Sequence, residues 1–503
     1  MCKYRSFFWD CDPEGTNFAI HQPIQNQVLT FFRVNAVYQF ISLAVLLILI
    51  RLPFLFTPLP LLIPELNWML VGEQMSNGFL MYRDIWDNTS PLSAVVYWLV
   101  TSVFGRSQVA FQLVAMFFSI TQAVYFNYMT NTRQLFTERN YVPGLMYVLF
   151  LNLSFDLCTL TPMLMSTTFL LLALGTVIKQ MERQGVTDEV FEIGFYLGVA
   201  TLFYLPSAIF IIWGAVSLIF FTGATFRQHS LMFLGFAFPV LVTGLVFYFS
   251  GGLGDLNRNL LASVFRVKQY KFNDFESLFV ALFTPLVLGV LGLFKTFNFT
   301  RFVNIQTRSQ QIMVLWLVVA FLSILLMPFL APMLFVVFIP VLAFFTTNYF
   351  LLFKKKFWIA ELIFTAATVT ILVVFYQGNA TNAADLGATH LQSLRVKPAL
   401  LPTNIVQKKI LVIGNDAGEY KDNQLATPYL NWNLAKYDLQ NLDYYDSVIS
   451  VLGHFNADPP EYIIDKENIV PQLMRRVPQL EAQYQPTTRK GIYKKINATP
   501  IKI

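Results

Sequence analysis

Long apolar stretches separated by short polar connections fill the chain from about residue 36 to residue 376. A helix that crosses a bilayer needs about 20 mostly apolar residues, and somewhat fewer inside a bundle. By this measure the pattern predicts about eleven crossings. They are 36–56, 108–129, 141–153, 161–178, 193–204, 207–221, 231–249, 278–294, 312–330, 333–353 and 357–376. We therefore expect a mostly α-helical, polytopic membrane bundle.

The apolar stretch 92–104 is a special case because it is short. As a helix it would rise only about 20 Å, whereas the hydrocarbon layer of a bilayer is about 30 Å thick. We expect this helix to lie at the membrane interface or to dip into it. Tyr97 and Trp98 would then be its interfacial anchors.

The distribution of Lys and Arg predicts the orientation. If the N-terminus is cytoplasmic, the connections on that side contain Arg133, Arg139, Lys179, Arg183, Arg227, Lys295, Arg301, Arg308, Lys354, Lys355 and Lys356. The opposite connections at 154–160, 205–206 and 331–332 contain no Lys or Arg. This is a positive-inside pattern, with the basic stretch 250–277 as its exception. A further crossing at 92–104 would invert every later connection, so the pattern argues against one.

Three regions follow from this topology: a cytoplasmic segment 1–35, a membrane domain 36–376, and an extracytoplasmic domain 377–503. The membrane domain includes a large first outer loop, 57–103. In the last region the composition becomes mixed, and 409–414 and 461–465 have the pattern of buried strands. Residues 471–484 have helical spacing, which Pro478 would kink or split. We expect a compact α/β domain there.

Composition excludes several classes of protein. Of the 503 residues, 55% are hydrophobic and only 13% charged, against about 25% charged in soluble domains. A soluble enzyme, a disordered chain and a fibrous protein are therefore excluded. The net charge of +6 is explained by basic cytoplasmic loops, so we expect no nucleic-acid partner. Three cysteines form neither a disulfide framework nor a zinc site.

Candidate chemistry is concentrated in the first outer loop. Glu65 stands at the start of an amphipathic helix predicted over 65–76, which we expect to lie along the membrane surface, and Arg83, Asp84 and Asp87 close the loop. A carboxylate held at a membrane surface can take a proton from an acceptor hydroxyl, or hold a divalent metal beside a lipid-linked phosphate. The alternative is that Glu65 interacts only with the N-terminus of its own helix.

The loop resembles the first extracytoplasmic loop of GT-C class glycosyltransferases, integral-membrane enzymes that use polyprenyl-phosphate sugars. That family has an acidic residue or pair, a helix, then G-x-x-x-Y-R-D and K-P-P-L. This chain has Glu65, then Gly78 and Tyr82-Arg83-Asp84, and later Ser90-Pro91-Leu92. The strand around 459–465 and the segment 491–494 are similar to the tails of dolichyl-phosphate-mannose transferase relatives.

The resemblance implies a GT-C-like bundle, a lipid-linked sugar donor and a set of catalytic residues. Glu65 would be the base or a metal ligand, helped by Asp84 or by Asp156 in the second outer loop. Asp156 would be the second ligand of a divalent metal, Mg²⁺ or Mn²⁺. The substrate would be bound by Arg83, Asp87, Arg266 and Lys268, whose cationic members would neutralise the leaving phosphate.

The chain departs from the family at three positions. Pro64 precedes Glu65, so a single acid replaces the frequent acidic pair. Thr89-Ser90 stand where some members have a Lys before the two prolines. Met163 occupies a place where relatives frequently have an Asp. These departures favour an alternative: a non-catalytic scaffold or assembly partner of a cell-envelope system, with a protein partner bound through the C-terminal domain.

Two further sets of charges leave alternatives open. Arg51, near the outer end of the first span, either contacts a lipid phosphate or, as we favour, extends to the interface. The stretch 250–277 holds Arg258, Arg266 and Lys268 among aromatic residues. These cations would clamp a polyprenyl phosphate, lie over anionic lipid, or pair with Asp274 and Glu276.

The leading function is transfer of a sugar from a polyprenyl-phosphate donor to an envelope acceptor on the outer face of the cytoplasmic membrane. A transporter ranks last, because apart from Arg51 charged groups are nearly absent from the spans. Residues 1–35 lack the pattern of a signal peptide. The chain is compatible with a bacterial inner membrane, in which case its C-terminal domain is periplasmic and its other partners are membrane lipids.

Overall fold

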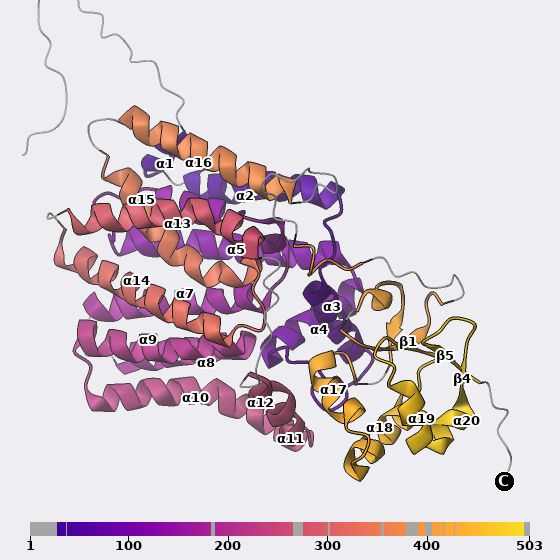
Figure 1. The fold of residues 1–503 in the computed structure, drawn as a ribbon. Coiled ribbons are helices and arrows are strands. Elements are labelled where there is room, and N and C mark those ends of the chain that lie inside the picture. Colours follow the sequence, from indigo (N-terminus) through magenta and orange to yellow (C-terminus); the bar gives the residue numbers. More distant parts are fainter. Residues whose placement is uncertain are drawn as a thin grey trace, which may run out of the picture.

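A computed structural model describes residues 28–36, 38–182, 187–264, 275–299, 302–353, 357–378, 391–397, 405–415, 417–426 and 428–496. Most of these residues form helices that lie side by side in one bundle (Figure 1). A small domain with a β-sheet lies at one end of the bundle, which we call the domain end. The chain is therefore a polytopic helical bundle with a C-terminal α/β domain, as predicted.

The helices of the first half of the bundle follow the predicted order. They are α1 (Val28–Arg33), α2 (Tyr38–Phe56), α3 (Ile63–Ser76), α4 (Pro91–Phe104), α5 (Gln108–Thr132), α6 (Val142–Phe150), η1 (Phe155–Cys158), α7 (Pro162–Glu182), α8 (Thr187–Phe203), η2 (Leu205–Ile209), α9 (Phe210–Ser217) and η3 (Leu218–Thr222).

The second half continues after a turn at Gly223. It contains α10 (Phe226–Phe249), α11 (Leu253–Leu256), η4 (Asn257–Leu261), α12 (Ala262–Val264), α13 (Phe275–Phe297), α14 (Asn304–Ser323), η6 (Ile324–Leu326), η7 (Pro332–Phe338), α15 (Ile339–Leu351) and α16 (Phe357–Gln377).

Within the described ranges, nine helical segments are long and apolar enough to cross a membrane. They account for nine of the eleven predicted crossings. The other two are helices in the predicted places but are shorter: α6 and α8. The segment η7–α15 is almost completely buried, whereas α16 and α10 lie at the margins of the bundle and have few buried residues (Figure 1).

The short helix α4 packs against α3 and is not among the nine segments. The expectation that both of its aromatic residues are interfacial anchors is wrong for Tyr97. Trp98 is exposed, but the ring of Tyr97 is buried, stacked between Trp68 and Phe111, and its hydroxyl donates a hydrogen bond to the Leu160 carbonyl at 2.9 Å. Tyr97 therefore belongs to the protein interior.

Glycines allow α8 and α10 to approach closely. A Cβ at Gly194 or Gly198 of α8 would collide with the carbonyl oxygens of Met232 and Phe236 on α10. A Cβ at Gly235 of α10 would meet the carbonyl of Phe191 in the same way. Packing of two backbones at this distance is typical of small residues at helix interfaces in membranes.

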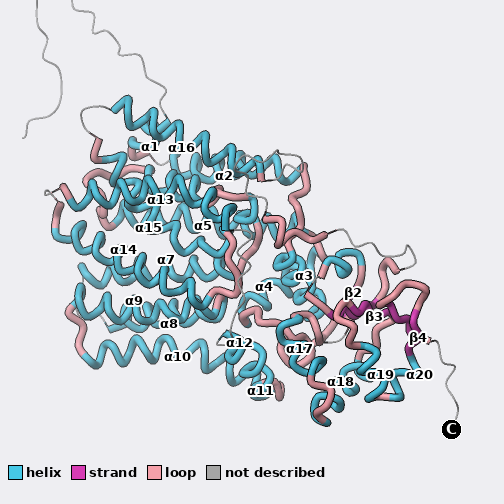
Figure 2. Tube along the Cα trace, in the orientation of Figure 1, coloured by secondary structure: helices cyan, strands magenta, loops and turns pink. Residues whose placement is uncertain are grey.

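The C-terminal domain has a five-stranded sheet in the order β2-β1-β3-β5-β4 (Figure 2). Strands β1 (Lys409–Ile413), β2 (Gln424–Leu425) and β3 (Tyr462–Asp465) are parallel, and β5 (Ile492–Lys495) is antiparallel to β3 and to β4 (Tyr484–Pro486). Its helical elements are η8 (Gly418–Asp422), α17 (Trp432–Gln440), α18 (Tyr445–Ala457), α19 (Val470–Arg476) and α20 (Pro478–Gln483). The predicted split at Pro478 is confirmed, because α19 ends and α20 begins there.

The C-terminal domain is fixed to α3 and to the loop that follows it. The amide of Ile63 donates to the Leu394 carbonyl and the amide of Val396 donates to the Leu61 carbonyl. The side chain of Gln74 donates to the Leu425 carbonyl at 2.9 Å. Much of α3 is buried, and it packs mainly against α4, while its expected position along the membrane surface stays a prediction.

Candidate functional site

Glu65 is buried at the start of α3, with 1% of its surface exposed. Pro64 suits the first turn of this helix, where no backbone donor is needed. The Glu65 Oε2 atom accepts a hydrogen bond from the Gln108 side-chain amide at 3.0 Å. The other oxygen, Oε1, is buried without a hydrogen-bond partner. Glu65 therefore has one fixed carboxyl oxygen and one that is free to accept a proton.

The surroundings of Glu65 favour its neutral form. Burial raises the pKa of Glu65 to about 7, against the opposing effects of the hydrogen bonds from Gln108 and the Leu62 backbone. A carboxyl group with a pKa near the working pH is suited to general-base catalysis.

Asp156 is the second buried acid, in the 3-10 turn η1 between α6 and α7. Its Oδ2 atom accepts a hydrogen bond from the Met333 amide at 2.7 Å, while Oδ1 is buried without a partner. Burial raises the pKa of Asp156 to about 6, and hydrogen bonds from Ser154 and from backbone amides oppose this. Its environment thus repeats that of Glu65: one held oxygen and one free oxygen.

The charges of Glu65 and Asp156 both act on the buried thiol of Cys158. Burial raises the pKa of this thiol to about 11, and the charges of Arg51, Asp156 and Glu65 all act on it. Cys158 and Arg51 also line a cavity of about 10 Å³ together with Gln112. The two acids predicted to act together therefore share an electrostatic effect on one buried thiol.

Arg51 is buried in the protein, so the favoured expectation that it extends to the interface is wrong. Its guanidinium donates to the Asn152 side chain at 3.0 Å, to the Ser119 hydroxyl at 3.2 Å, and to the carbonyls of Leu151 and Leu157 at 2.9 and 3.3 Å. These partners compensate for removing the charge from water. Three of the four bonds go to the segment 151–157, so Arg51 holds the loop that carries Asp156.

Asp84 and Arg83 neutralise each other at the surface. Arg83 binds the Asp84 carboxylate through two hydrogen bonds of 2.9 Å and also donates to the Ser250 carbonyl at 3.4 Å. Partial burial acts to raise the pKa of Asp84, but bonds from Arg83 and from the Leu80 amide outweigh it and hold the pKa below its usual range. Asp84 lies in an ion pair, and half of the Arg83 side-chain surface is exposed.

Asp87 connects the first loop to the C-terminal domain. Its carboxylate is buried, accepts hydrogen bonds from the amide and hydroxyl of Thr89, and accepts one from the Asn431 side chain at 3.3 Å. The neighbouring Trp86 donates its amide to the Pro428 carbonyl at 2.6 Å and packs within the core of that domain. These contacts indicate a positional role for Asp87.

Arg258 joins three segments at the same place. Its guanidinium lies 4.8 Å from the centre of the Trp86 ring and pairs with Asp438 of α17 at 2.7 Å. Arg266 and Lys268, which were predicted to contact phosphate, lie outside the described residues. So do the acid Asp274 and the rest of the segment 265–274, whereas 250–264 and 275–277 are described.

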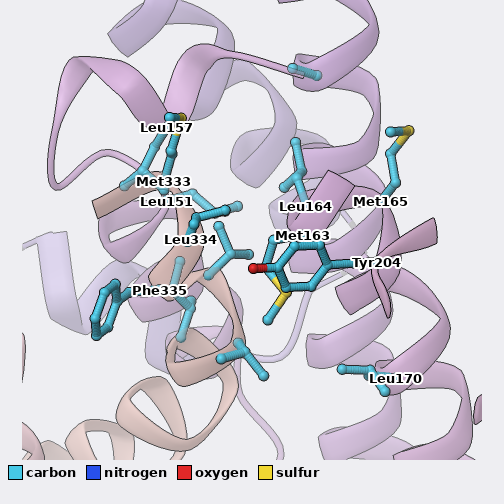
Figure 3. Packing of buried hydrophobic residues seen from close by; sticks show 14 of the residues in the cluster. Leu151, Leu157, Met163, Leu164, Met165, Leu170, Tyr204, Met333, Leu334 and Phe335 are labelled. Carbon is cyan, nitrogen blue, oxygen red and sulfur yellow. The ribbon is translucent and has the colours of Figure 1, made fainter. Parts of the chain in front are cut away.

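Large apolar side chains pack around Met163, at the start of α7, close to the neighbours of Asp156. Met163 is fully buried, and Figure 3 shows it in one cluster with Tyr204 and Leu334. The same cluster contains Leu157 and Met333, which are neighbours of Asp156. The position where relatives frequently have a third acid is thus part of a hydrophobic core.

Two carboxylates do not make up a typical metal site. Across the described ranges, no three His, Cys, Asp or Glu side chains gather closely enough to hold a metal ion. A hard divalent cation such as Mg²⁺ takes six oxygen ligands in near-octahedral geometry, with waters or substrate oxygens completing the set. The pair predicted as ligands, Glu65 and Asp156, therefore does not fit a resident metal by itself, and no step below uses one.

Gln108 is a residue at this site that the sequence did not point to. It is the only described side chain that hydrogen bonds to Glu65, but a polar residue at the first position of a helix is common. Helical spacing places Gln108 on the same face of α5 as Gln112, Ser119 and Gln122, which are buried, whereas Gln108 itself is half-buried.

No protein-family model matches the sequence, and no curated protein matches it. Among solved structures, the chain is similar to ArnT from Cupriavidus metallidurans bound to undecaprenyl phosphate, with 12% identity and a TM-score of 0.48 over 69% of this chain and 67% of that chain. For apo ArnT the values are 14%, 0.49, 68% and 66%. An oligosaccharyltransferase from Archaeoglobus fulgidus, in complex with Zn and sulfate, gives 12%, 0.48, 91% and 73%.

Proposed function

We propose that the protein is a membrane glycosyltransferase of the GT-C type, which moves a sugar from a polyprenyl-phosphate donor to an acceptor at the domain end of the bundle. The observation that carries the proposal is Glu65. It is a buried carboxyl group with a pKa of about 7 and one free oxygen, and it lies in the loop whose motifs resemble that family.

In this reaction the acceptor hydroxyl attacks the anomeric carbon of the donor, and the bond from that carbon to the phosphate oxygen breaks. Glu65 Oε1 takes the proton of the hydroxyl as the new glycosidic bond forms. The polyprenyl phosphate leaves with the bonding electron pair. Its negative charge would be stabilised by nearby cations, and the candidates from the sequence are Arg83, Arg266 and Lys268.

The proposed orientation places the domain end outside the cytoplasm. Because Arg106 contacts the C-terminal domain and α5 follows directly, Arg133 at the end of α5 lies at the far end of the bundle. Lys179 at the end of α7 and Arg227 at the start of α10 belong to the same end by the alternation of the helices. This distribution supports a bacterial inner membrane with the domain in the periplasm.

The test uses the purified full-length chain in lipid nanodiscs with a panel of undecaprenyl-phosphate-linked sugars and a membrane lipid extract as the acceptor source. Release of undecaprenyl phosphate is measured by chromatography. Wild type should release it, and Glu65→Gln should lose at least about 100-fold of that rate. Arg227→Gln, at the opposite end, is the control and should retain the rate. A Glu65→Gln variant as active as wild type would overturn the proposal.

A second candidate function is a non-catalytic scaffold for a cell-envelope assembly. The apolar packing of Met163 with Tyr204 and Leu334 favours it, because a hydrophobic core stands where a third acid was expected (Figure 3). In the same assay, a scaffold would release no undecaprenyl phosphate with any donor. It would instead co-purify with one partner in a fixed ratio, and Glu65→Gln would leave that ratio unchanged.

A further inference from the structure

Gln108 reaches from the first turn of α5 to the side chain of Glu65 on α3. Its amide nitrogen lies 3.0 Å from Glu65 Oε2, and no other side-chain hydrogen bond to this carboxyl occurs in the described ranges. An amide can donate to a carboxylate oxygen without changing its own charge. Gln108 therefore determines which of the two carboxyl oxygens is occupied.

The position of Gln108 is itself fixed from two sides. Ser107 caps the N-terminus of α5, with its hydroxyl accepting from the Ala110 amide at 3.4 Å. Arg106 binds Glu73 on α3 through its Nε atom at 2.7 Å. It also donates to the carbonyls of Tyr420 at 2.6 Å and Asn423 at 3.0 Å in the C-terminal domain. The start of α5 is thus held against α3 and against the domain at once.

The aromatic side chain of Tyr97 makes its contacts with residues other than Glu65. Tyr97, whose ring stacks on Trp68, donates its hydroxyl to the Leu160 carbonyl at 2.9 Å. Without Gln108, the Glu65 carboxyl would keep only the hydrogen bond from the Leu62 backbone, and neither oxygen would have a side-chain donor among the described residues.

We propose that Gln108 is a positioning residue for Glu65: its amide holds Oε2, so that Oε1 is the oxygen that receives the proton of the acceptor. This inference rests on the proposed glycosyl transfer. Arg106, just before α5, contacts the C-terminal domain, and Gln108, in the first turn of α5, contacts Glu65. Docking of the domain and alignment of the carboxyl are therefore connected through these two residues.

The experiment replaces the amide by a side chain of similar length that cannot donate, Gln108→Met. Release of undecaprenyl phosphate from undecaprenyl-phosphate-linked sugars is measured in nanodiscs. We expect kcat to fall about 10- to 100-fold, as for a misaligned catalytic group, with the KM for the donor unchanged. Gln122→Met is the matched control, since it also removes a hydrogen-bonded glutamine from α5, one that is buried and bonds to Leu164 and Tyr147.

A double variant separates positioning from a general loss of structure. If Gln108 acts through Glu65, adding Gln108→Met to Glu65→Gln should lower the residual rate no further. Full activity of Gln108→Met, or independent effects in the double variant, would overturn the inference while the loss in Glu65→Gln still supported the enzyme. Full activity of Glu65→Gln would overturn the enzyme itself.

An infrared measurement tests the contact without turnover. The absorption of the Glu65 carboxyl is isolated as the difference between wild type and Glu65→Gln. This band should shift in Gln108→Met and stay in place in Gln122→Met. An unshifted band in Gln108→Met would overturn the positioning role, whether or not the protein transfers sugar.

Discussion

Ionisation of Glu65 is opposed by the folded protein, and this has a measurable consequence for stability. Its pKa rises from 4.5 to about 7 on folding, so between these pH values the folded state keeps a proton that the unfolded state loses. The free energy of unfolding should therefore decrease as the pH rises through this window, by about 3 kcal/mol in total. Glu65→Gln cannot ionise. It should match wild type near pH 4 and be about 3 kcal/mol more stable at pH 8.

Asp84→Asn is the control for that comparison, because the pKa of Asp84 is lowered rather than raised. Its carboxylate stabilises the folded state at neutral pH, so this variant should be less stable than wild type at pH 8 and should approach it in acid. Unfolding in detergent micelles from pH 4 to pH 8 measures both effects. Parallel curves for Glu65→Gln and wild type would contradict the assignment.

Arg51 should contribute more to stability than a surface arginine does. Arg51→Met leaves the Asn152 side chain and the carbonyls of Leu151 and Leu157 without their donor in a buried site. We expect a loss of about 3 kcal/mol, seen as a lower unfolding temperature. Arg83→Met removes a half-exposed cation and should cost less than about 1 kcal/mol. Equal losses of stability in the two variants would show that the buried hydrogen bonds of Arg51 stabilise the protein no more than the surface contacts of Arg83 do.

At the scale of single residues, composition and motifs predicted which acids to consider, and the structure supplied their partners. Glu65 and Asp156 were predicted from residue type and place in the loop. The partner of Glu65 was not, because Gln108 is 43 positions away along the chain and no local pattern connects them. Arg51 was assigned to the interface because its acceptors lie about 100 residues further on. Asp87 contacts Thr89 and Asn431, and its role in substrate binding stays a prediction.

Among the elements, the pair α8 and α10 offers the clearest test of packing. Gly194→Ala would drive a methyl group into the Met232 carbonyl and force the helices apart. Overpacking of this kind costs about 1–3 kcal/mol, so the unfolding temperature should fall. Gly244→Ala in α10 is the control, because nothing lies within 4 Å of its added Cβ, and alanine favours a helix. A Gly194→Ala variant as stable as Gly244→Ala would show that the backbones are not in tight contact.

Hydrophobic periodicity predicted the elements well because helices that face lipid and helices in the protein core are both long and apolar. Helices occur at all eleven expected places, and the shortest expected segments, 141–153 and 193–204, became α6 and α8. Local sequence also predicted the division at Pro478, since proline cannot continue a helix. Periodicity did not predict the burial of α3. Its cover comes mainly from α4, with a hydrogen bond from Gln74 to Leu425 of the C-terminal domain, hundreds of residues away.

For the whole molecule, the main question is how the C-terminal domain is held on the bundle. Trp86 lies in the core of the domain although it belongs to the first loop. Its ring meets Tyr429 and His454 edge to face and lies under Arg258, and its backbone exchanges hydrogen bonds with Pro428 and Asn431. The Trp86 side chain is therefore buried among side chains of the domain, and two backbone hydrogen bonds fix its position.

Trp86→Ala should loosen this attachment while leaving the bundle folded. Truncating a buried tryptophan costs about 3–5 kcal/mol, enough to open a local interface without global unfolding. Hydrogen exchange should then accelerate at the amides of Trp86 and Asn431 and stay slow in α7 and α15. Tyr445→Ala removes an exposed ring of the same domain and should change neither region.

Because Arg106 connects that domain to α5, a loosened domain in Trp86→Ala should also free Gln108. Exchange at the start of α5 would then rise with exchange at Asn431, and a start of α5 that stays protected would separate the domain from the carboxyl site.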